Sequence, residues 1–176
     1  MSTIKVDRIE PKDGLQSNAM GGIVQVVRVV HTGQVSSNST TYVSTGLQAS
    51  ITPRSASNKI MVSFEHSIYH SNTLDSDLWS LHGIKIKRGT QSVYTPVTNN
   101  NGPYDFGLYD SDNANISQQY NRSRVEYLDS PATTGTITYS TEIACFNNNG
   151  TVYVNYSNSD TVVAPQSWMT LTEITA

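Results

Sequence analysis

The sequence has few of the residues that mark disulfide-rich or membrane-spanning proteins. Its single cysteine, Cys145, cannot form an internal disulfide, so no disulfide framework supports the fold. No apolar run approaches the roughly 20 residues of a membrane-spanning helix, and the N-terminus has no apolar segment of the signal-peptide type. We therefore expect a protein that is made in a cytoplasm and does not insert into a membrane.

Charged residues are also scarce. Asp, Glu, Lys and Arg make up 14% of the chain, whereas about 25% is usual. The formal net charge is −3, and the tightest basic group, Lys85, Lys87 and Arg88, is typical of one polar face of a strand. A nucleic-acid partner requires clustered Lys and Arg that neutralise phosphates. The sequence therefore argues against nucleic-acid binding.

The sequence contains no group of residues typical of catalysis. Neither standard glycine-rich phosphate-binding pattern is present, and Cys145 lies in an apolar alternation that predicts a buried side chain rather than a nucleophile. Glu65, Glu126 and Glu142 are candidates for the carboxylate pair of a glycan-cleaving enzyme only because they are glutamates, and no pattern favours them. We predict that the protein is not an enzyme and binds no cofactor.

Two stretches resemble metal sites without matching one. His66 and His70 are four residues apart, which on a strand separates their Cα atoms by roughly 13 Å. They are therefore expected to be core or interface histidines, unless copies of one of them meet at a three-fold axis. Asp110 and Asp112 lie in the oxygen-rich stretch "DSDNAN", which lacks EF-hand spacing. We predict no metal site and keep these two residues as weak calcium candidates.

Small polar and β-forming residues are abundant. Ser, Thr and Asn make up about a third of the chain, and the apolar residues are rich in Val, Ile and Tyr. Alternating apolar and polar residues predict about eight strands separated by turn signals. The segments that contain them are 22–33, 40–53, 58–70, 81–89, 91–97, 123–131, 135–146, 147–156 and 167–174. Asn149-Gly150 predicts a tight hairpin between the strands that flank it.

No helix longer than one turn is expected, so the strands are predicted to pack as a two-sheet antiparallel β-sandwich. The number of strands favours a jelly roll. An immunoglobulin-like sandwich is the alternative, although no pair of cysteines around a tryptophan supports it. We divide the chain into an N-terminal segment, residues 1–21, and a jelly-roll domain, residues 22–176.

The first long strand is apolar on both faces. One face carries Ile23, Val27 and Val29, and the other carries Val24, Val26 and Val30. A strand of this kind is covered on both faces, by the core of its own domain on one side and by a partner subunit or a loop on the other. We predict a trimer interface that includes Val24, Val26, Val27 and Val29.

A lone β-forming segment, "TIKVDRI", precedes this domain at residues 3–9. A single strand is not stable alone, and the polar residues 11–21 are long enough to let it reach a neighbouring protein. Strand addition to another protein's sheet is a known mode of recognition. We predict that residues 1–10 anchor the chain to a partner through Ile4, Val6 and Ile9.

A long polar insertion between residues 98 and 120 carries three aromatic residues, Tyr104, Phe106 and Tyr109, and a weak helical turn near Ile116. Aromatic side chains in an exposed loop can stack on sugar rings or anchor a protein contact. They can equally hold the loop against its own domain. Both interpretations stay open, and the first makes this segment a target-binding loop.

Several stretches, taken in order, resemble small structural proteins of tailed bacteriophages, which are common in marine and cyanobacterial phages. They are "STIKVD", "GGIVQVV", "STGLQASITPRSASNKIMV", "KIKRG", "YLDSPATTGTITYS" and "MTLTEI". The resemblance covers nearly the whole chain apart from about 96–120. It implies a jelly roll of the tumour-necrosis-factor type that forms homotrimers on a tail fibre or a capsid surface. The chain departs from long fibres because it has no repeat and no shaft sequence.

The residues and the resemblance together predict a virion protein that is not an enzyme. The favoured function is a trimeric fibre or receptor-binding module, held to other virion proteins by its N-terminal segment and facing a host-surface glycan or protein. The first alternative is a capsid decoration protein that stabilises the shell. The second is a carbohydrate-binding domain.

Overall fold

The structure is a computed structural model, and every regular element in its described residues is a β-strand. The described residues are 22–72, 78–99, 102–103, 105–110, 118–146, 150–157 and 165–176. The prediction of an all-β protein is confirmed for this part of the chain, which contains no helix long and apolar enough to cross a membrane. The predicted anchor with Ile4, Val6 and Ile9, the turn near Ile116, and the residues Tyr104 and Asp112 lie outside the described residues.

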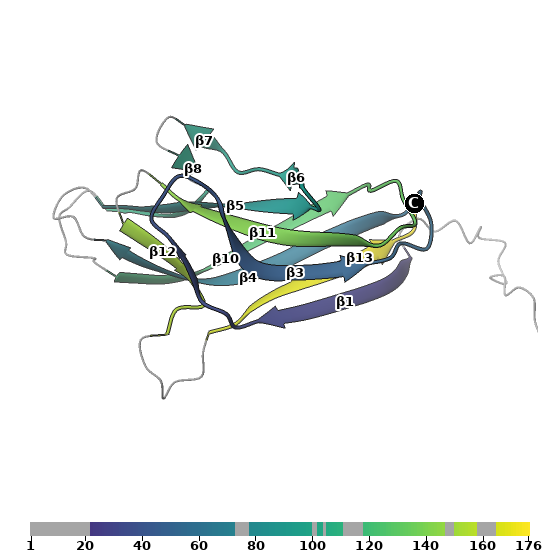
Figure 1. Cartoon of the computed structure of the whole chain (residues 1–176), viewed down its shortest axis with the longest axis horizontal. Helices are drawn as coiled ribbons and strands as arrows, with labels where there is room; N and C mark the ends of the chain where they lie inside the picture. Colours follow the sequence, from purple (N-terminus) through teal and green to yellow (C-terminus); the bar gives the residue numbers. More distant parts are fainter. Residues whose placement is uncertain are drawn as a thin grey trace, which may run out of the picture.

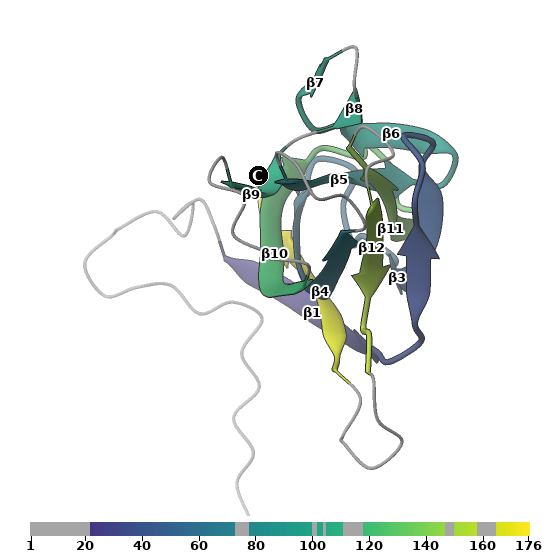
Figure 2. The ribbon, with the colours of Figure 1, turned by 90° about the vertical axis from the view of Figure 1, so that its left-hand side faces the viewer.

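Two antiparallel sheets pack face to face, as predicted for a β-sandwich (Figures 1 and 2). The larger sheet has six strands: β1 (Ile23–His31), β13 (Ser167–Ile174), β4 (Lys59–Asn72), β12 (Gly150–Val154), β2 (Val35–Ser37) and β10 (Gln118–Asp129). β4 is its central strand. β10 pairs with one edge of β4 from Ile60 to Ser71. On the other edge, β13 pairs with the first part of β4 and β12 pairs with its last part.

The second sheet has five strands: β3 (Val43–Ile51), β11 (Ile137–Cys145), β5 (Leu78–Arg88), β6 (Gln91–Tyr94) and β9 (Phe106–Asp110). A separate ribbon pairs β7 (Thr98–Asn99) with β8 (Gly102–Pro103). Much of the insertion that was predicted as a loop is therefore strand, and β9 pairs with β5. These strands were missed because they are short and rich in Gly, Asn and Asp, which are depleted in strands.

The core lies between the sheets, and the alternation of β4 shows how the sequence builds it. Ile60, Val62, Phe64 and Ile68 point inward and are fully or almost fully buried. Side chains of β3, β5, β11, β12 and β13 complete the core: Leu47, Ala49, Ile51, Ile84, Ile86, Tyr139, Ile143, Val152, Val154, Met169 and Leu171. Burial of each large apolar side chain contributes about 1.5–3 kcal/mol, so the predicted alternation accounts for the packing of the two sheets.

The predicted hairpin at Asn149-Gly150 is wrong. β11, which precedes it, pairs with β3 and β5 in the five-stranded sheet, whereas β12, which follows it, pairs with β4 and β2 in the six-stranded sheet. The chain crosses from one sheet to the other here. A turn signal covers only a few residues, and the burial of Val152 and Val154 against the opposite sheet decides which strands pair.

The two ends of the sandwich differ (Figure 1). β1 begins and β13 ends at one end, where Ile23 pairs with Ile174. β4 ends and β10 begins at the opposite end, where Ser71 pairs with Gln118. The start of the described domain is therefore far from the end at which β4 stops. We call these the entry end and the far end.

Candidate functional site: the outer face of the six-stranded sheet

The face of the six-stranded sheet that points away from the core, here the outer face, collects exposed apolar side chains. Among the described residues, six large apolar side chains are exposed, and four of them lie on this face. Val26 (55% exposed) and Val30 (50%) come from β1, and Tyr120 (60%) and Leu128 (44%) come from β10. Single exposed apolar residues are normal on a protein surface, whereas a face that gathers several of them marks an interaction site.

The register of the strands orders these side chains into rows across the sheet. Near the entry end, Val26 of β1 is opposite Thr172 of β13, which is opposite Met61 of β4, which is opposite Leu128 of β10. Three of these four side chains, Val26, Met61 and Leu128, are apolar, and we call these three residues the apolar row.

The middle of the outer face carries arginine, glutamate and tryptophan. The guanidinium carbons of Arg28 and Arg124 lie 4.6 Å and 5.6 Å from the centre of the Trp168 ring. Cation–π contacts of this kind contribute about 0.5–1 kcal/mol each at exposed sites. They connect β1, β13 and β10 through side chains rather than through the backbone ladder.

Two ion pairs lie beside this tryptophan. Arg122 contacts Glu65 at 2.8 Å and Arg124 contacts Glu126 at 2.6 Å. The hydrogen bond and charge of Arg124, together with a hydrogen bond from Ser63, hold the pKa of Glu126 below its usual value. Both arginines are well exposed, so the pairs add little to stability, but they give the face charges of both signs.

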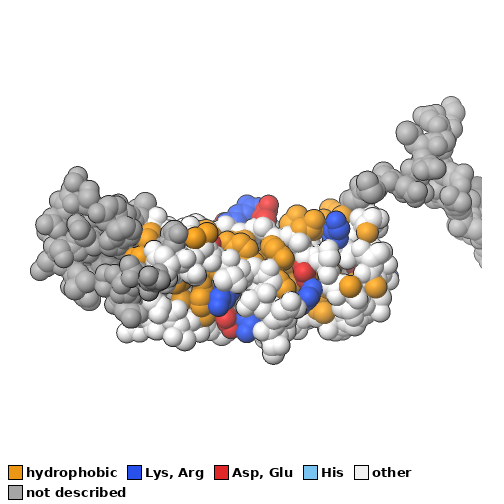
Figure 3. Space-filling model, turned by 90° about the horizontal axis from the view of Figure 1, so that it is seen from above, with side chains coloured by type: hydrophobic (Ala, Val, Ile, Leu, Met, Phe, Trp, Pro, Cys, Tyr) orange, Lys and Arg blue, Asp and Glu red, His pale blue; other side chains and the backbone are white. Residues whose placement is uncertain are grey.

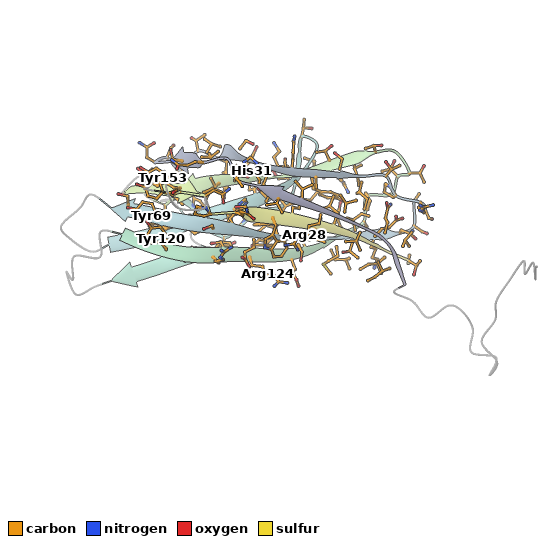
Figure 4. All side chains as sticks on the ribbon, turned by 90° about the horizontal axis from the view of Figure 1, so that it is seen from below. Arg28, His31, Tyr69, Tyr120, Arg124 and Tyr153 are labelled. Carbon is orange, nitrogen blue, oxygen red and sulfur yellow. The ribbon has the colours of Figure 1, made fainter. Side chains whose placement is uncertain are left out.

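Tyrosines form a row near the far end. Tyr120 of β10 and Tyr153 of β12 are both opposite Tyr69 of β4, and their ring centres lie 4.7 Å and 5.5 Å from that of Tyr69 (Figure 4). A fourth ring, Tyr156, stacks on Tyr69 at 4.3 Å and 12°. We call these four residues the tyrosine row.

The position of Tyr156 follows from the backbone of the residue before it. Asn155 has a φ of 55°, a left-handed conformation that Asn tolerates better than most residues. Its side chain donates hydrogen bonds to the carbonyl oxygens of His31 and Gly33, which fixes the turn. The turn places the ring of Tyr156 over Tyr69, which is buried. Burial raises the pKa of Tyr69, against a smaller opposing effect of its hydrogen bond with Ser71.

The structure divides the predicted interface residues between the two faces of β1. Val26 is exposed on the outer face, and Val24 is half-buried. Val27 and Val29 pack against the core of the same chain. One apolar face of β1 is therefore used for the core of its own domain, and Val26 is the residue of the predicted interface that faces outward.

The aromatic residues of the insertion are only partly described. Phe106 packs against the core and stacks on the ring of His82, with 5.5 Å between ring centres and 20° between planes. For Phe106, attachment to its own domain is the correct interpretation. Tyr109 pairs through its backbone with Trp79 in β5, and its side chain lies outside the described residues, as does that of Asp110.

The carboxylates considered for catalysis are held in ion pairs. Glu65 and Glu126 lie on the outer face with arginine partners, and Glu142 lies on the other sheet, 3.3 Å from the ammonium group of Lys87. Cys145 is 3% exposed, so its predicted burial is confirmed, and this burial raises the pKa of its thiol to about 11.

Histidines and acidic residues form no metal site in the described part of the chain, where no three His, Cys, Asp or Glu side chains are grouped to hold an ion. His66 and His70 are 0% and 1% exposed between the sheets. Neither ring reaches the surface, so the idea that copies of one of them meet at a three-fold axis is wrong.

Sequence reasoning missed the tyrosine row and the Trp168 cluster. In the alternation of residues 58–70, Tyr69 falls on the face opposite to Ile60, Val62 and Phe64, and this phase is the one available signal. Tyr69, Tyr120 and Tyr153 are far apart in the sequence and become neighbours only through the pairing of β4 with β10 and β12.

No protein-family model matches this chain, and no curated protein sequence is significantly similar to it. The interpretation of the outer face therefore depends on its own geometry and chemistry.

Proposed function

We propose that the protein is a structural protein of a tailed-phage virion that assembles as a homotrimer through the outer face. The observation that supports this most directly is the set of exposed apolar side chains on that face, Val26, Val30, Tyr120 and Leu128. They lie in register with Met61, Trp168 and Tyr69. Apolar rows from several strands, with arginine and tryptophan between them, resemble the composition of protein–protein interfaces.

The charges of the outer face favour another copy of the same chain as the partner. The face carries both basic and acidic side chains: Arg28, Arg122, Arg124, Glu65 and Glu126. A face with charges of both signs can meet a copy of itself without accumulating charge of one sign. The opposite side of the molecule, seen from above in Figure 3, is mostly uncharged, with few basic and acidic side chains.

The strand order supports a jelly roll of the tumour-necrosis-factor type as the finer description of the fold. In one sheet β1, β13, β4 and β10 are neighbours, and in the other β3, β11, β5 and β9 are neighbours. In chain order, β3, β4 and β5 alternate between the sheets, and so do β9, β10, β11 and β13. Two sheets of four strands linked in this way are the jelly-roll arrangement.

The difference between the two ends of the sandwich fits attachment by the N-terminal segment. β1 begins at the entry end, while β4 and β11 stop at the far end (Figure 1). In the proposal, residues 1–10 hold the chain to another virion protein, and the far end faces away from the particle. This orientation matches a fibre or receptor-binding module.

A carbohydrate-binding function is the second candidate, and one observation favours it. The ring of Tyr120 is 60% exposed and lies against Tyr69 on one side. An exposed tyrosine ring can stack on a sugar. This function requires that the tyrosine row stays uncovered, whereas the homotrimer requires that at least the apolar row is covered.

The proposed trimer is tested by native mass spectrometry and sedimentation of the full-length protein, which should give three chains. Val26→Lys places a charge in the apolar row and should yield folded monomers, because an unpaired charge is costly to bury at an interface. Val97→Lys is the matched control, since Val97 is 58% exposed and lies outside the six-stranded sheet. A stable monomer of the unaltered chain, or a trimer of the Val26→Lys variant, would contradict the proposal.

Location on the particle is a separate test. Electron density or antibody labelling near the tail would support a fibre module, and density over the whole shell would support capsid decoration. Absence of the chain from purified virions would refute both.

A further inference from the structure

The four histidines of the chain all have inward positions in the sandwich, and three of them are buried completely. His66 and His82 are 0% exposed and His70 is 1% exposed. The fourth, His31, is half-buried and its ring packs near Gly33 and Gly46. Buried polar groups need hydrogen-bond partners, and the partners of these rings form two chains across the core.

The first chain runs from β3 to the turn after β12. The hydroxyl groups of Thr45 and Thr141 are 2.6 Å apart, and that of Thr141 is 2.9 Å from Nε2 of His66. Nδ1 of His66 is 2.8 Å from the hydroxyl of Ser167, which donates to Oδ1 of Asn155 at 2.8 Å.

The amide of Asn155 sets the direction of the bonds between Asn155, Ser167 and His66. Its NH₂ group donates to the carbonyl oxygens of His31 and Gly33, so its Oδ1 faces Ser167. A carbonyl oxygen only accepts, so the single hydroxyl proton of Ser167 is used there. Nδ1 of His66 must then donate to Ser167. Burial lowers the pKa of His66, so the ring is neutral, and its Nε2 then accepts from Thr141.

The second chain joins two histidines. Nε2 of His70 is 2.8 Å from Nδ1 of His82, and Nε2 of His82 is 2.8 Å from the hydroxyl of Ser123. Two ring nitrogens at this distance share one proton. Two charged rings would point N–H groups at each other, so this contact cannot persist when both histidines are protonated.

Both chains connect the two sheets. His66, His70, Ser123 and Ser167 belong to the six-stranded sheet, whereas His82 lies in β5, and Thr141 and Thr45 in β11 and β3 of the five-stranded sheet. These polar contacts between the sheets therefore depend on neutral histidines, in addition to the bonds that Arg88 and Tyr139 of the five-stranded sheet make to Asp129 of β10.

The titratable groups that face these rings cannot compensate a positive charge. In the described part of the chain, the groups that act on His66 and His82 are other histidines: His31 from β1, His66 and His70 from β4. Cys145 of β11 is opposite His82, and burial keeps its thiol protonated. Ser123 and Ser167, from β10 and β13, are neutral hydroxyls, and Phe106 of β9 is apolar.

We propose that the three buried histidines form an acid-sensitive lock, which holds the two sheets together while the rings are neutral and opens the sandwich cooperatively when acid protonates them. The lock is a property of one domain and does not rest on the proposed trimer. Burial lowers the pKa of His70 to about 4. Burial, with a smaller effect of His31, lowers the pKa of His66 to about 3.

The same direction holds for His82, whose pKa is well below the usual value through burial and then through His70 and His66. In the unfolded chain all three histidines have pKa values near 6.5. As pH falls below that value, the histidines of the unfolded chain therefore bind protons, whereas those of the folded chain stay neutral. Each such histidine raises the unfolding equilibrium constant about tenfold per pH unit, so three raise it about 1,000-fold.

The test measures the logarithm of the unfolding equilibrium constant as a function of pH, by urea unfolding of the full-length chain at fixed protein concentration. The slope of this plot gives the number of protons taken up on unfolding. Over the pH unit below about 6, the slope should approach three protons per chain, because ordinary carboxyl groups contribute little there. A slope of one or less would overturn the proposal.

His70→Gln is the informative variant, because the amide of Gln occupies the position of Nε2 and can still bond to His82 while it binds no proton. Its slope should fall by about one proton, which is a tenfold smaller change per pH unit. Ser123→Ala is the control: it removes a hydrogen bond from His82 without removing a proton site. It should lower stability at every pH and leave the slope unchanged. An unchanged slope in His70→Gln would refute the lock.

A measurement on the unaltered protein covers the case in which His70→Gln does not fold. Nitrogen-15 chemical shifts of the imidazole rings should show three neutral histidines from neutral pH down to the pH at which the protein unfolds. His66 should show the proton on Nδ1. A ring among these three that titrates near pH 6.5 in the folded protein would overturn the proposal.

Discussion

At the scale of single residues, Glu173 is a buried carboxylate that neutral donors satisfy. One of its oxygens accepts from the side chain of Asn58 at 2.6 Å and from the backbone N–H of Arg54 at 2.7 Å, and the other accepts from Gln25 at 2.6 Å. Burial alone would raise the pKa of Glu173, but these hydrogen bonds outweigh it and lower the pKa below the usual value. Glu173, which lies in β13, thus connects the turn after β3 through Arg54 and Asn58, and β1 through Gln25.

Glu173→Gln should lower the free energy of unfolding at neutral pH by about 1–3 kcal/mol, because an NH₂ group then faces donors that cannot all turn away. A lowered pKa in the folded state means that the carboxylate stabilises the fold above its unfolded pKa and loses that effect as pH falls through the folded value. The difference between the two proteins should therefore narrow toward acid. Urea unfolding at several pH values measures it.

Glu142→Gln is the matched control for that experiment, because Glu142 is partly exposed and pairs with Lys87. Its loss should change stability by no more than about 1 kcal/mol. Equal effects of the two substitutions would show that the hydrogen bonds of Glu173 do not stabilise the fold.

At the scale of elements, the tyrosine row shows how neighbouring strands gain stability from side chains as well as from backbone pairing. Tyr69, Tyr120 and Tyr153 come from three adjacent strands. Tyr156 reaches the row from the segment after β12, and its ring lies 4.3 Å from Tyr69 and 4.9 Å from Tyr153. Aromatic pairs contribute about 0.5–1.5 kcal/mol each beyond their burial.

Tyr156→Ala removes two of these ring contacts and should lower the free energy of unfolding by about 1–3 kcal/mol. Tyr156→Phe keeps both rings in contact and should remain close to the unaltered protein. Thermal or urea unfolding compares the two variants. If they are equally stable, the stacking on Tyr69 contributes nothing, and the row is better explained as a surface that a partner covers.

At the scale of the whole molecule, the core described above is built from strands that lie within residues 22–176. The domain and the predicted anchor are therefore separable in the proposal. Folding should reside in the sandwich, and attachment to the virion should reside in residues 1–10.

Deletion of residues 2–10 should leave a folded protein with the same oligomeric state, because the core and the outer face are intact. Circular dichroism and native mass spectrometry check this. The deleted protein should no longer join the virion, which comparison of purified particles measures. Ile4→Asp with Val6→Asp in the full-length chain should have the same effect. Normal incorporation of either variant would refute the anchor.

Local patterns in the sequence were enough to predict the class of the fold and much of its core. Alternation in β4 assigned Ile60, Val62, Phe64, His66 and Ile68 to one buried face, because successive side chains of a strand point to opposite sides. This pattern is local, so it can be recognised in the sequence without knowing which strands pair with each other. The strands of the insertion were missed because their residues carry no such pattern.

The pairing of the strands, and with it the candidate site, depends on packing across the whole domain. The hairpin expected at Asn149-Gly150 is replaced by a crossing between sheets, and Val27 and Val29 face the core while Val26 faces outward. The outer face and the histidine chains join residues from distant segments. Their contacts depend on register and sheet order, which follow from the joint burial of all the strands and not from any one stretch of sequence.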